Sequence, residues 1–499
     1  MPTTTRRALT IALLGALPAA GCSLKPTPIT ELELKEQATT RIERIAETRT
    51  PVNGALTLSD AIARAVQYNL DHRVEMYETA LRHADLGVST AALLPALAAS
   101  AGRSERNNPL ASSSYNLVTN TQNFGYSTSQ DERLRTADLS ISWNILDFGL
   151  SYVRARQSAD KVLIAQENRR RVVHKLVSEV RTAYWRAYAA DRMRDRLRRL
   201  EARTLAALST NRRQADDRTT SPIVAITFRR ELIEIRRTLQ ELQRELASAK
   251  IQLAALINER PDSSFRLAAP KSPAGLSPRS PHVDQLIAVA MEKRPELREV
   301  TYRRRINSHE LHAALLELLP GIQMFKGQNF DSNAYLLHDQ WVNWGIKASW
   351  NVIRLLQYPA RREVIEAQND ALAQRDLALT LAIMTQIHVS RARIAVMMRE
   401  RETASSYTAA QRELVGHVRA EFASDRISEQ TLLREELNDS VGEIRKLLAD
   451  ANVHSAHADL VAAVGIDPPT YTEDLPALER IGDVKAAGPQ AQHAALKAK

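Results

Sequence analysis

An internal duplication covers most of the chain and restricts the fold to two similar halves. The segment 58–97 aligns with 283–322 without a gap, and a Leu-Pro pair near the end of each segment coincides. A second match pairs Ser-Trp-Asn-Ile at 142–145 with Ser-Trp-Asn-Val at 349–352. Matches of this length indicate two copies of one structural unit. We therefore predict an internal tandem repeat, with the same elements in the same order in both copies.

The first residues have the features of an export signal. Arg6 and Arg7 precede an apolar run and a small-residue cleavage site, which together are typical of a signal peptide over 1–21. Cys22 follows and is the only cysteine among 499 residues. Its position resembles a bacterial lipobox, which implies an acylated (palmitate-bearing) lipoprotein held at a membrane without a spanning helix. The alternative is ordinary signal cleavage beside an incidental cysteine. Residues 22–55 are predicted to form an extended, lipid-anchored N-terminal arm.

The composition favours long helices over a compact globular core. Glycine is scarce at 16 residues, and aromatic residues make up 5% of the chain, a profile typical of extended helical or coiled-coil proteins. The formal net charge is +10, but arginines are interleaved with glutamates in stretches such as 229–241. Such interleaving indicates a solvated helix face rather than a nucleic-acid surface. Beyond the signal, no run approaches the ~18 apolar residues of a membrane helix.

Two polar islands interrupt the helical pattern, one in each repeat. Apolar residues occupy every second position at 137–145, and the same alternation returns at 342–350. A period of two indicates a strand with one apolar and one polar face. We predict two β-strands near 96–146 and two near 321–352, each about ten residues long, which suits a tilted transmembrane strand. Half-buried hairpins of a soluble domain are the alternative.

Three tryptophans support the membrane interpretation, because aromatic residues gather where transmembrane strands meet the bilayer interface. They are Trp143, Trp344 and Trp350. Four strands cannot close a barrel, since the smallest known barrels have about eight, and open edges in lipid leave backbone groups unpaired. The predicted fold is therefore mainly α with a membrane β-barrel portion: three copies form a 12-stranded β-barrel and, beneath it, a long α-helical barrel.

A long helix and a shorter one are predicted after each strand pair, at 150–215 and 222–258, then at 359–423 and 429–465. Another helix precedes each strand pair. At 1.5 Å per residue the long helices span about 95–100 Å and the short ones roughly 55 Å. Two short helices laid end to end therefore match one long helix, and each repeat is expected to pack them in that way.

The repeats are predicted to cover 56–260 and 283–467. A linker at 261–282, rich in proline and serine, joins them, and a flexible tail follows at 468–499. Within each repeat a compact turn joins the long helix to its short partner. These two turns lie about 100 Å from the strands, so they form the far tip of the rod.

The chain resembles the TolC-type outer-membrane efflux proteins, specifically the lipid-anchored outer-membrane factors. The resemblance covers about 58–467 and rests on Leu-Ser-Asp-Ala-Ile-Ala-Arg-Ala at 58–65, the two Leu-Pro pairs, and Trp-Asn-Ile-Leu-Asp-Phe-Gly at 143–149. It implies a homotrimer in the outer membrane of a Gram-negative bacterium, with most of the chain in the periplasm. The implied partners are a periplasmic adaptor protein and an inner-membrane pump or ABC exporter.

The function implied by this resemblance is that of a passive exit duct of a tripartite efflux or secretion system, gated at its periplasmic tip. One alternative is a duct for type I protein secretion or polymer export rather than drug or metal efflux. A periplasmic coiled-coil scaffold lipoprotein without a pore is another. The sequence does not indicate the cargo.

The resemblance also assigns roles at the tip. The candidate adaptor contacts are Asp217, Arg218, Ser221, Asp425, Arg426 and Ser428. Aspartate stands at both turns where the family commonly has glycine. The aperture candidates are Glu429, Thr431, Arg434 and Glu435. Because an arginine stands among them, a mixed Arg/Glu network is expected here rather than an acidic ring.

No catalytic constellation is recognisable. The chain has no glycine-rich phosphate loop, nucleophile elbow or zincin motif. His309 and His312, and likewise His454 and His457, lie at helical spacing, but such pairs are usually structural. We therefore expect a protein that is not an enzyme, with no cofactor and no metal site.

Overall fold

The computed structural model describes residues 28–47, 52, 54–216, 221–261, 263, 265–269 and 282–467. The predicted signal peptide, Cys22 and the C-terminal tail lie outside these residues. The chain divides into two compact units, Met1–Pro51 and Val52–Lys499.

The first unit contains helix α2 (Glu31–Glu47), whose described side chains are all exposed. The Glu33 N–H donates to Thr30 Oγ1 at 3.3 Å, and the Thr30 N–H donates to Glu33 Oε2 at 2.8 Å. This reciprocal capping box starts a helix. The prediction of an extended arm over 22–55 is therefore wrong across α2.

The second unit contains the duplicated elements. Those of the first copy are α3 (Leu58–Tyr68), α4 (Leu70–Ala91), β2 (Ala96–Glu105), β5 (Arg133–Asn144), α5 (Ile145–Asp216) and α6 (Pro222–Leu256). Those of the second copy are α7 (Val283–Lys293), α8 (Pro295–Leu316), β7 (Gly321–Asp331), β8 (Gln340–Ser349), α9 (Ile353–Ala423) and α10 (Glu429–Val464). The order of these elements is the same in both copies, as the duplication predicts. Both long helices begin before their predicted starts. In the second, Pro359 lies inside α9 and not at its start. A proline removes one helical hydrogen bond, but the residues before it can still be helical.

The helix before each strand pair is broken in two, contrary to the single helix predicted. Asn69 has an extended backbone (φ −61°, ψ 131°), and its side chain accepts a hydrogen bond from the His72 N–H, which caps α4. Arg294 is also extended, because it precedes Pro295 and the residue before a proline avoids the helical region. The two breaks fall at the same position of the internal alignment.

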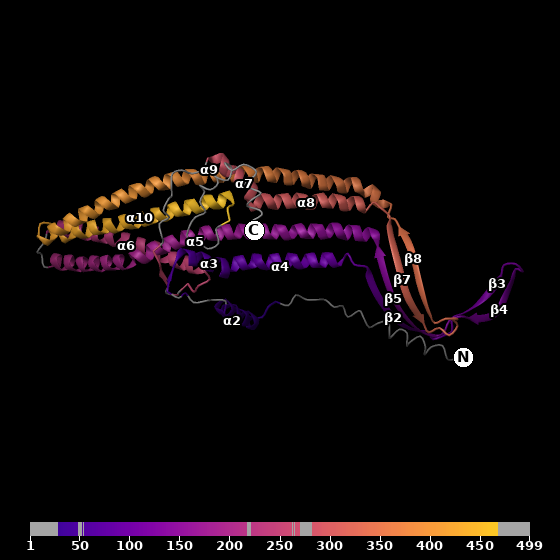
Figure 1. Ribbon diagram of the computed structural model, residues 1–499. Coiled ribbons are helices and arrows are strands. Elements are labelled where there is room, and N and C mark those ends of the chain that lie inside the picture. The colour runs from indigo at the N-terminus through magenta and orange to yellow at the C-terminus, as the bar shows by residue number, and fades with distance from the viewer. Residues whose placement is uncertain are drawn as a thin grey trace. The chain divides into compact units, whose positions relative to one another are not determined.

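Four strands form one antiparallel sheet in the order β2-β5-β7-β8, so β5 pairs with β7 of the other repeat (Figure 1). The edges of this sheet are β2 and β8. Between β2 and β5 the chain forms a further hairpin of β3 (Ala111–Asn116) and β4 (Thr121–Thr128). The prediction of two strands near 96–146 is therefore wrong in number, because this segment also contains β3 and β4. Its Ser-, Asn- and Thr-rich sequence has too few apolar residues to reveal a period of two.

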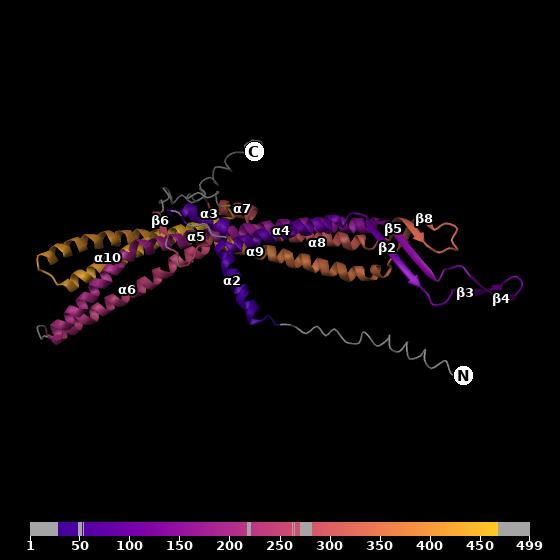
Figure 2. The ribbon, with the colours of Figure 1, turned by 90° about the horizontal axis from the view of Figure 1, so that it is seen from below.

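The helices continue the order of the strands. α5 packs against α4 and α8, and α8 packs against α9, so these four helices form one layer in the order α4-α5-α8-α9. Further along, α6 packs on α5, and α10 packs on both α9 and α5; Figure 2 shows α6 beside α5 and α10 beside α9. Each long helix therefore carries two shorter helices, as the length comparison predicts. The 72 residues of α5 correspond to about 108 Å at 1.5 Å per residue.

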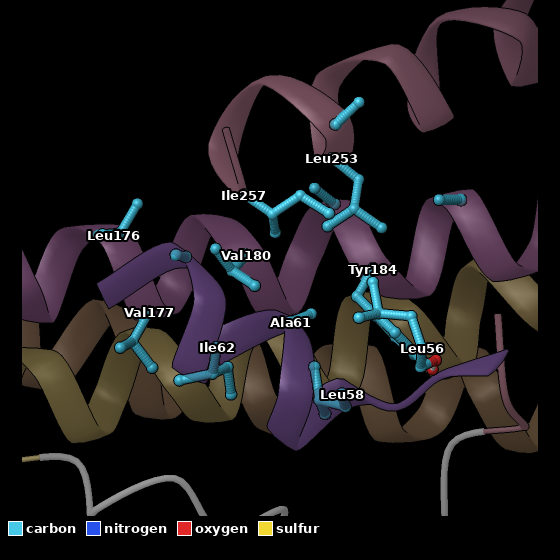
Figure 3. Close-up of a cluster of buried hydrophobic side chains, with 14 of the residues drawn as sticks. Leu56, Leu58, Ala61, Ile62, Leu176, Val177, Val180, Tyr184, Leu253 and Ile257 are labelled. Carbon is cyan, nitrogen blue, oxygen red and sulfur yellow. Dashed lines mark hydrogen bonds between the residues drawn. The ribbon is translucent and has the colours of Figure 1, made fainter. Parts of the chain in front are cut away.

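A buried cluster anchors α5 to the start of the second unit (Figure 3). The hydroxyl of Tyr184 lies 2.8 Å from the carbonyl oxygens of both Leu56 and Ala268, between which its proton is shared. These carbonyls belong to or adjoin a short parallel pair, β1 (Ala55–Leu56) and β6 (Arg266–Leu267). The cluster thus joins the segment before the first repeat (β1) to the segment after it (β6).

The surface linker predicted at 261–282 is wrong at Phe265, whereas its described residues 261, 266, 269 and 282 are exposed. Phe265 is 5% exposed and packs in the same cluster, because its ring and the neighbouring leucine of β6 gain more by burial than they lose by ordering the chain. The prolines and serines around Phe265 are typical of a surface linker, so its burial was not predicted.

Among the described residues, no helix combines the length and the apolar character that a membrane span requires.

Candidate functional site

The four-stranded sheet exposes its apolar side chains. In β5, Leu139, Ile141 and Trp143 are 51%, 45% and 39% exposed, whereas Ser140 and Ser142 between them are half-buried. An antiparallel sheet in water normally buries its apolar face and exposes its polar one. β5 has the opposite arrangement, and the edge strands β2 and β8 expose almost all their side chains.

The register extends this surface across all four strands, because directly paired residues lie on the same face. Ile141 pairs with Leu97 of β2, Trp143 pairs with Met324 of β7, and Met324 pairs with Ile346 of β8. We call this surface the outer face. Its apolar members are Leu97, Ala99, Ala101, Ala137, Leu139, Ile141, Trp143, Ile322, Met324, Phe330, Val342, Trp344, Ile346 and Ala348. Lys326 of β7 lies on the same face, opposite Ile141 and Trp344.

The opposite, inner face is mainly polar, and its apolar members are Ala96, Ala98, Leu134, Phe325 and Trp341. Phe325 of β7 pairs with Gly345 of β8, and a Cβ at Gly345 would lie 2.9 Å from the Phe325 ring. Glycine at this position therefore leaves the room that the ring occupies.

The three predicted membrane-strand tryptophans differ in position. Trp143 and Trp344 lie on the outer face, and the Trp143 ring meets Phe148 edge to face at 5.4 Å. The prediction that Trp350 lies in a strand is wrong, because the β7–β8 ladder ends at the pair of Gly321 and Ser349. Its Nε1 instead donates to the Leu318 carbonyl at 2.9 Å.

The helical layer has a concave side. A groove of about 1210 Å³ is lined by residues of all four helices α4, α5, α8 and α9, which requires the layer to curve around it. The charged residues of its wall are Glu75, Glu78, Arg82, Arg154, Lys161, Arg303, Glu310 and Arg361. Glu310 accepts hydrogen bonds from Arg154, from Gln157 at 3.1 Å and from Arg361 at 3.0 Å. Burial acts to raise the pKa of Glu310, but these donors outweigh it and lower the pKa to about 2.

The turn between α9 and α10 closes through a left-handed residue. Asp425 has φ 53°, and the Arg426 N–H donates to the Glu421 carbonyl at 3.0 Å, the bond that spans a Schellman C-cap. Aspartate enters this conformation more readily than most side chains, which explains how it replaces the expected glycine. Ser428 then caps α10 by accepting from the Thr431 N–H at 3.3 Å.

The matching turn after α5 is described only in part. Asp217 and Arg218 lie outside the described residues. Ser221 precedes α6, and Pro222 is its first residue, but the Ser221 side chain makes no capping hydrogen bond. Ser428 therefore supplies a side-chain cap to α10, whereas α6 begins without one, since the fixed φ of proline already starts the helix.

The aperture candidates at the start of α10 reach neighbouring helices. Arg434 Nη1 lies 3.2 Å from Glu231 Oε1 of α6, and Glu435 accepts from Gln411 Nε2 of α9 at 2.8 Å. Partial burial acts to raise the pKa of Glu435, but hydrogen bonds from Gln411, Asn438 and Arg434 lower it. Within the chain, Arg434 thus pairs with Glu231 and, at 3.3 Å, with Glu435.

The other two aperture candidates are less connected. Glu429 is the exposed first residue of α10, and the Thr431 hydroxyl lies 3.1 Å from that of Ser428. Sequence reasoning missed Glu231, and it gave no role to Glu436, which accepts from Arg419 of α9 at 3.0 Å. Their partners lie on other helices, and a sequence-based search would have needed the relative register of those helices.

Among the described residues, no group of three or more His, Cys, Asp or Glu side chains is arranged to hold a metal ion. The rings of His309 and His312 lie 6.3 Å apart. His454 stacks on Trp185 at 4.2 Å. Burial, together with the positive charge of Arg401, lowers the pKa of His454 to about 4. His454 is therefore an uncharged packing residue at neutral pH.

Neither a family model nor a curated protein matches the sequence. Solved structures do match the fold. The MtrE outer membrane channel of Neisseria gonorrhoeae, in its open state, is 18% identical, with 84% of this chain and 91% of that chain covered at a TM-score of 0.62. For the CmeC outer membrane channel of Campylobacter jejuni the identity is 12%, the coverage 93% of each chain and the TM-score 0.63. For the outer membrane protein VceC of Vibrio cholerae these values are 10%, 82% of this chain and 96% of that chain, and 0.59.

The fold of this chain matches these structures over 91–96% of their own length. Together with the sequence motifs at 58–65 and 143–149, they confirm the expected resemblance at the level of the fold. The fold is that of the TolC-type outer-membrane efflux channels.

Proposed function

We propose that this chain is one subunit of a homotrimeric outer-membrane channel, the passive exit duct of a tripartite efflux or secretion system. The observation that carries the proposal is the outer face of the sheet. Leu139, Ile141 and Trp344 are 51%, 45% and 79% exposed there. Covering such a surface with lipid gains about 25 cal/mol per Å² of apolar area. The strands of this sheet contain 10 to 12 residues, a length that crosses a bilayer at a tilt.

Self-assembly follows from the two edges of the sheet. β2 and β8 each have one unpaired side, and lipid does not tolerate unpaired backbone groups. Pairing β2 of one copy with β8 of the next satisfies both edges. Three copies then give twelve strands, above the minimum of about eight for a closed membrane barrel. The resemblance to TolC-type proteins favours three copies.

The flanks of the helical layer support the same contact. On α4, Tyr77 and Leu81 are 68% and 49% exposed, and on α9, Leu377 and Leu381 are 63% and 66% exposed. Their spacing of four residues puts each set on one side of its helix, and apolar stripes of this kind mark interfaces. Contact between α4 of one copy and α9 of the next would continue the layer around an axis.

A closed ring of such layers encloses a charged, water-filled lumen, because the concave groove faces the axis. We place the gate at the start of α10, with Glu429, Thr431, Arg434 and Glu435 as the aperture residues. The pair of Arg434 with Glu231, at 3.2 Å, holds α10 to α6 when the gate is closed. An adaptor would contact the turns beside the gate, through Asp217, Arg218, Ser221, Asp425, Arg426 and Ser428.

We also propose where the protein lies in the cell. Removal of 1–21 would leave Cys22 as the acylated N-terminus in the outer membrane, with the helices of 56–260 and 283–467 mainly in the periplasm. A periplasmic adaptor and an inner-membrane pump or ABC exporter would supply substrate and energy. The conduit itself then needs no catalytic residue.

Conductance of the purified full-length protein in planar lipid bilayers tests this function. Discrete steps are expected, because a closed ring conducts ions through a lumen of fixed size. Glu231→Gln should increase the fraction of time in the open state, since it removes the charge that holds Arg434. Glu234→Gln is the matched control, because Glu234 lies on the same helix and, among the residues that the structure describes, its carboxylate pairs only with Arg237 of α6, at 3.9 Å. Membrane-bound protein without discrete steps would favour a scaffold without a pore.

A further inference from the structure

The end of the sheet away from the helices carries arginines on the outer face. Arg103 of β2 and Arg135 of β5 are directly paired, one step beyond the last apolar pair of that face. Arg133 is next along β5, opposite Glu105. All four residues occupy the same alternate positions as the apolar band, so they continue its surface.

This cluster is unfavourable within the chain alone. Like charges directly opposite each other destabilise an antiparallel pair. Glu105 compensates only in part, with its carboxylate 2.7 Å from Arg133 Nε and 3.5 Å from Arg103 Nη2. The guanidinium of Arg135 makes no hydrogen bond or ion pair to any residue that the structure describes. Three guanidinium groups against one carboxylate leave a net charge of +2.

The cluster lies at the depth of the lipid headgroups in the proposed orientation. Arg135 is eight residues from Trp143 along β5, which is about 26 Å of strand and about 20 Å of depth at a tilt of 35–45°. The apolar band of a membrane barrel is about 25 Å tall. Arginine side chains extend along apolar surface toward the headgroups, so these guanidinium groups reach the far interface.

We propose that Arg103, Arg133 and Arg135 form a binding site for the phosphate groups of an outer-leaflet lipid. Planar guanidinium groups bind phosphate oxygens through paired, charge-assisted hydrogen bonds. A phosphate between Arg103 and Arg135 replaces their mutual repulsion with two attractions. The acyl chains of the same lipid lie on Leu97 and Ile141 below. The inference rests on the proposed function, because it requires the sheet to lie in a bilayer.

The apolar band favours a lipid over free phosphate as the source of the anion. A lipid contacts both the arginines and the exposed aliphatic side chains beneath them, whereas inorganic phosphate contacts only the arginines. Exposed arginines facing water alone would bind phosphate weakly and would be screened by salt. Competition between the two ligands therefore separates them.

The test measures binding of fluorescent diphosphoryl lipid A to the full-length protein in non-ionic detergent. The competitors are unlabelled diphosphoryl lipid A, the same lipid with both phosphates removed, and inorganic phosphate. The variants are Arg135→Gln and the double variant R103Q/R135Q. Lys347→Gln is the charge-matched control for the single variant, because Lys347 pairs with Gln323 on the inner face of the sheet.

The diphosphoryl lipid should bind wild-type protein about 10- to 30-fold more tightly than the dephosphorylated lipid, from two arginines near an anionic headgroup. R103Q/R135Q should lose most of this preference, Arg135→Gln part of it, and Lys347→Gln none. A double variant that keeps the preference would overturn the site, and so would inorganic phosphate that competes as well as the lipid.

Flotation of the wild-type protein with phosphatidylcholine vesicles separates the two levels of the argument. Protein that inserts but shows no phosphate preference overturns the lipid site alone. Protein that does not insert overturns the membrane location of the sheet, and with it the lipid site.

Discussion

Leu139→Arg tests whether the outer face of the sheet meets lipid. Leu139 is four residues from Trp143 along β5, which is about 13 Å of strand and about 10 Å of depth at the usual tilt. That position is close to the middle of an apolar band about 25 Å tall. Arginine at the midplane of a membrane barrel costs about 2–4 kcal/mol. Three copies would place three such arginines in one assembly.

Ser140→Arg is the matched control, because it adds the same side chain one residue away on the inner face. The inner face would line a water-filled lumen, where arginine changes conductance but leaves the free energy of unfolding within about 0.5 kcal/mol. Urea unfolding of protein inserted in phosphatidylcholine vesicles, followed by tryptophan fluorescence, measures both variants. Equal stabilities for wild type and Leu139→Arg would refute the reasoning, because a sheet in water tolerates arginine at a side chain that is 51% exposed.

Three further predictions concern the helices. Ser428→Ala should speed amide hydrogen exchange in the first turn of α10 by the loss of about 1 kcal/mol, whereas Ser221→Ala should change α6 little, because Ser221 makes no capping bond. Tyr184→Phe should lower the free energy of unfolding by about 1–3 kcal/mol, since the Ala268 carbonyl loses the hydroxyl donor and the Leu56 carbonyl keeps only the Ala268 N–H, and urea titration measures this. His454 stays neutral when folded, with its pKa lowered to about 4, so the unfolded state takes up the proton first and stability is lost as the pH falls from 6.5 through 4. His454→Phe keeps a ring on Trp185 and should remove about 2 kcal/mol of the stability lost between pH 7.5 and pH 5; an unchanged loss would contradict this.

The repeated architecture could be predicted because its signals are periodic and local. The alternation at 137–145 identified β5, and the compact turn after each long helix placed the starts of α6 and α10. The lengths of the helices then predicted that two short helices pack along each long one. All these features depend on residues close together in the chain, which is why they are visible without a structure.

Other features depend on contacts that a single sequence does not reveal. The β3–β4 hairpin has almost no apolar period, and the break at Asn69 depends on a side-chain cap rather than on a glycine or proline. Phe265 was hidden in a proline-rich segment because its burial depends on Tyr184 far away in the sequence. The role of Glu231 depends on its contact with Arg434, 203 residues away on α10.

Alternation alone also did not reveal the direction of the apolar face. The same pattern in β5 fits a soluble sheet with a buried apolar face. The structure adds the direction of that face, because Leu139 and Ile141 are more exposed than Ser140 and Ser142 in the single chain. The arginine cluster at the far end of this face became visible only through the β2–β5 register.

The central claim is that β2 of one copy pairs with β8 of the next in a ring of three, and disulfide cross-linking tests it most directly. Cys22 is the only cysteine of the chain, so Cys22→Ser gives a background without thiols. Into it, Ala99→Cys on β2 is combined in turn with Val342→Cys, Ile346→Cys or Ala348→Cys on β8. At one register, oxidation in membranes should give species of two and three times the chain mass, and none larger. A ladder that continues past three, or no cross-link at any register across the strand, would contradict the account.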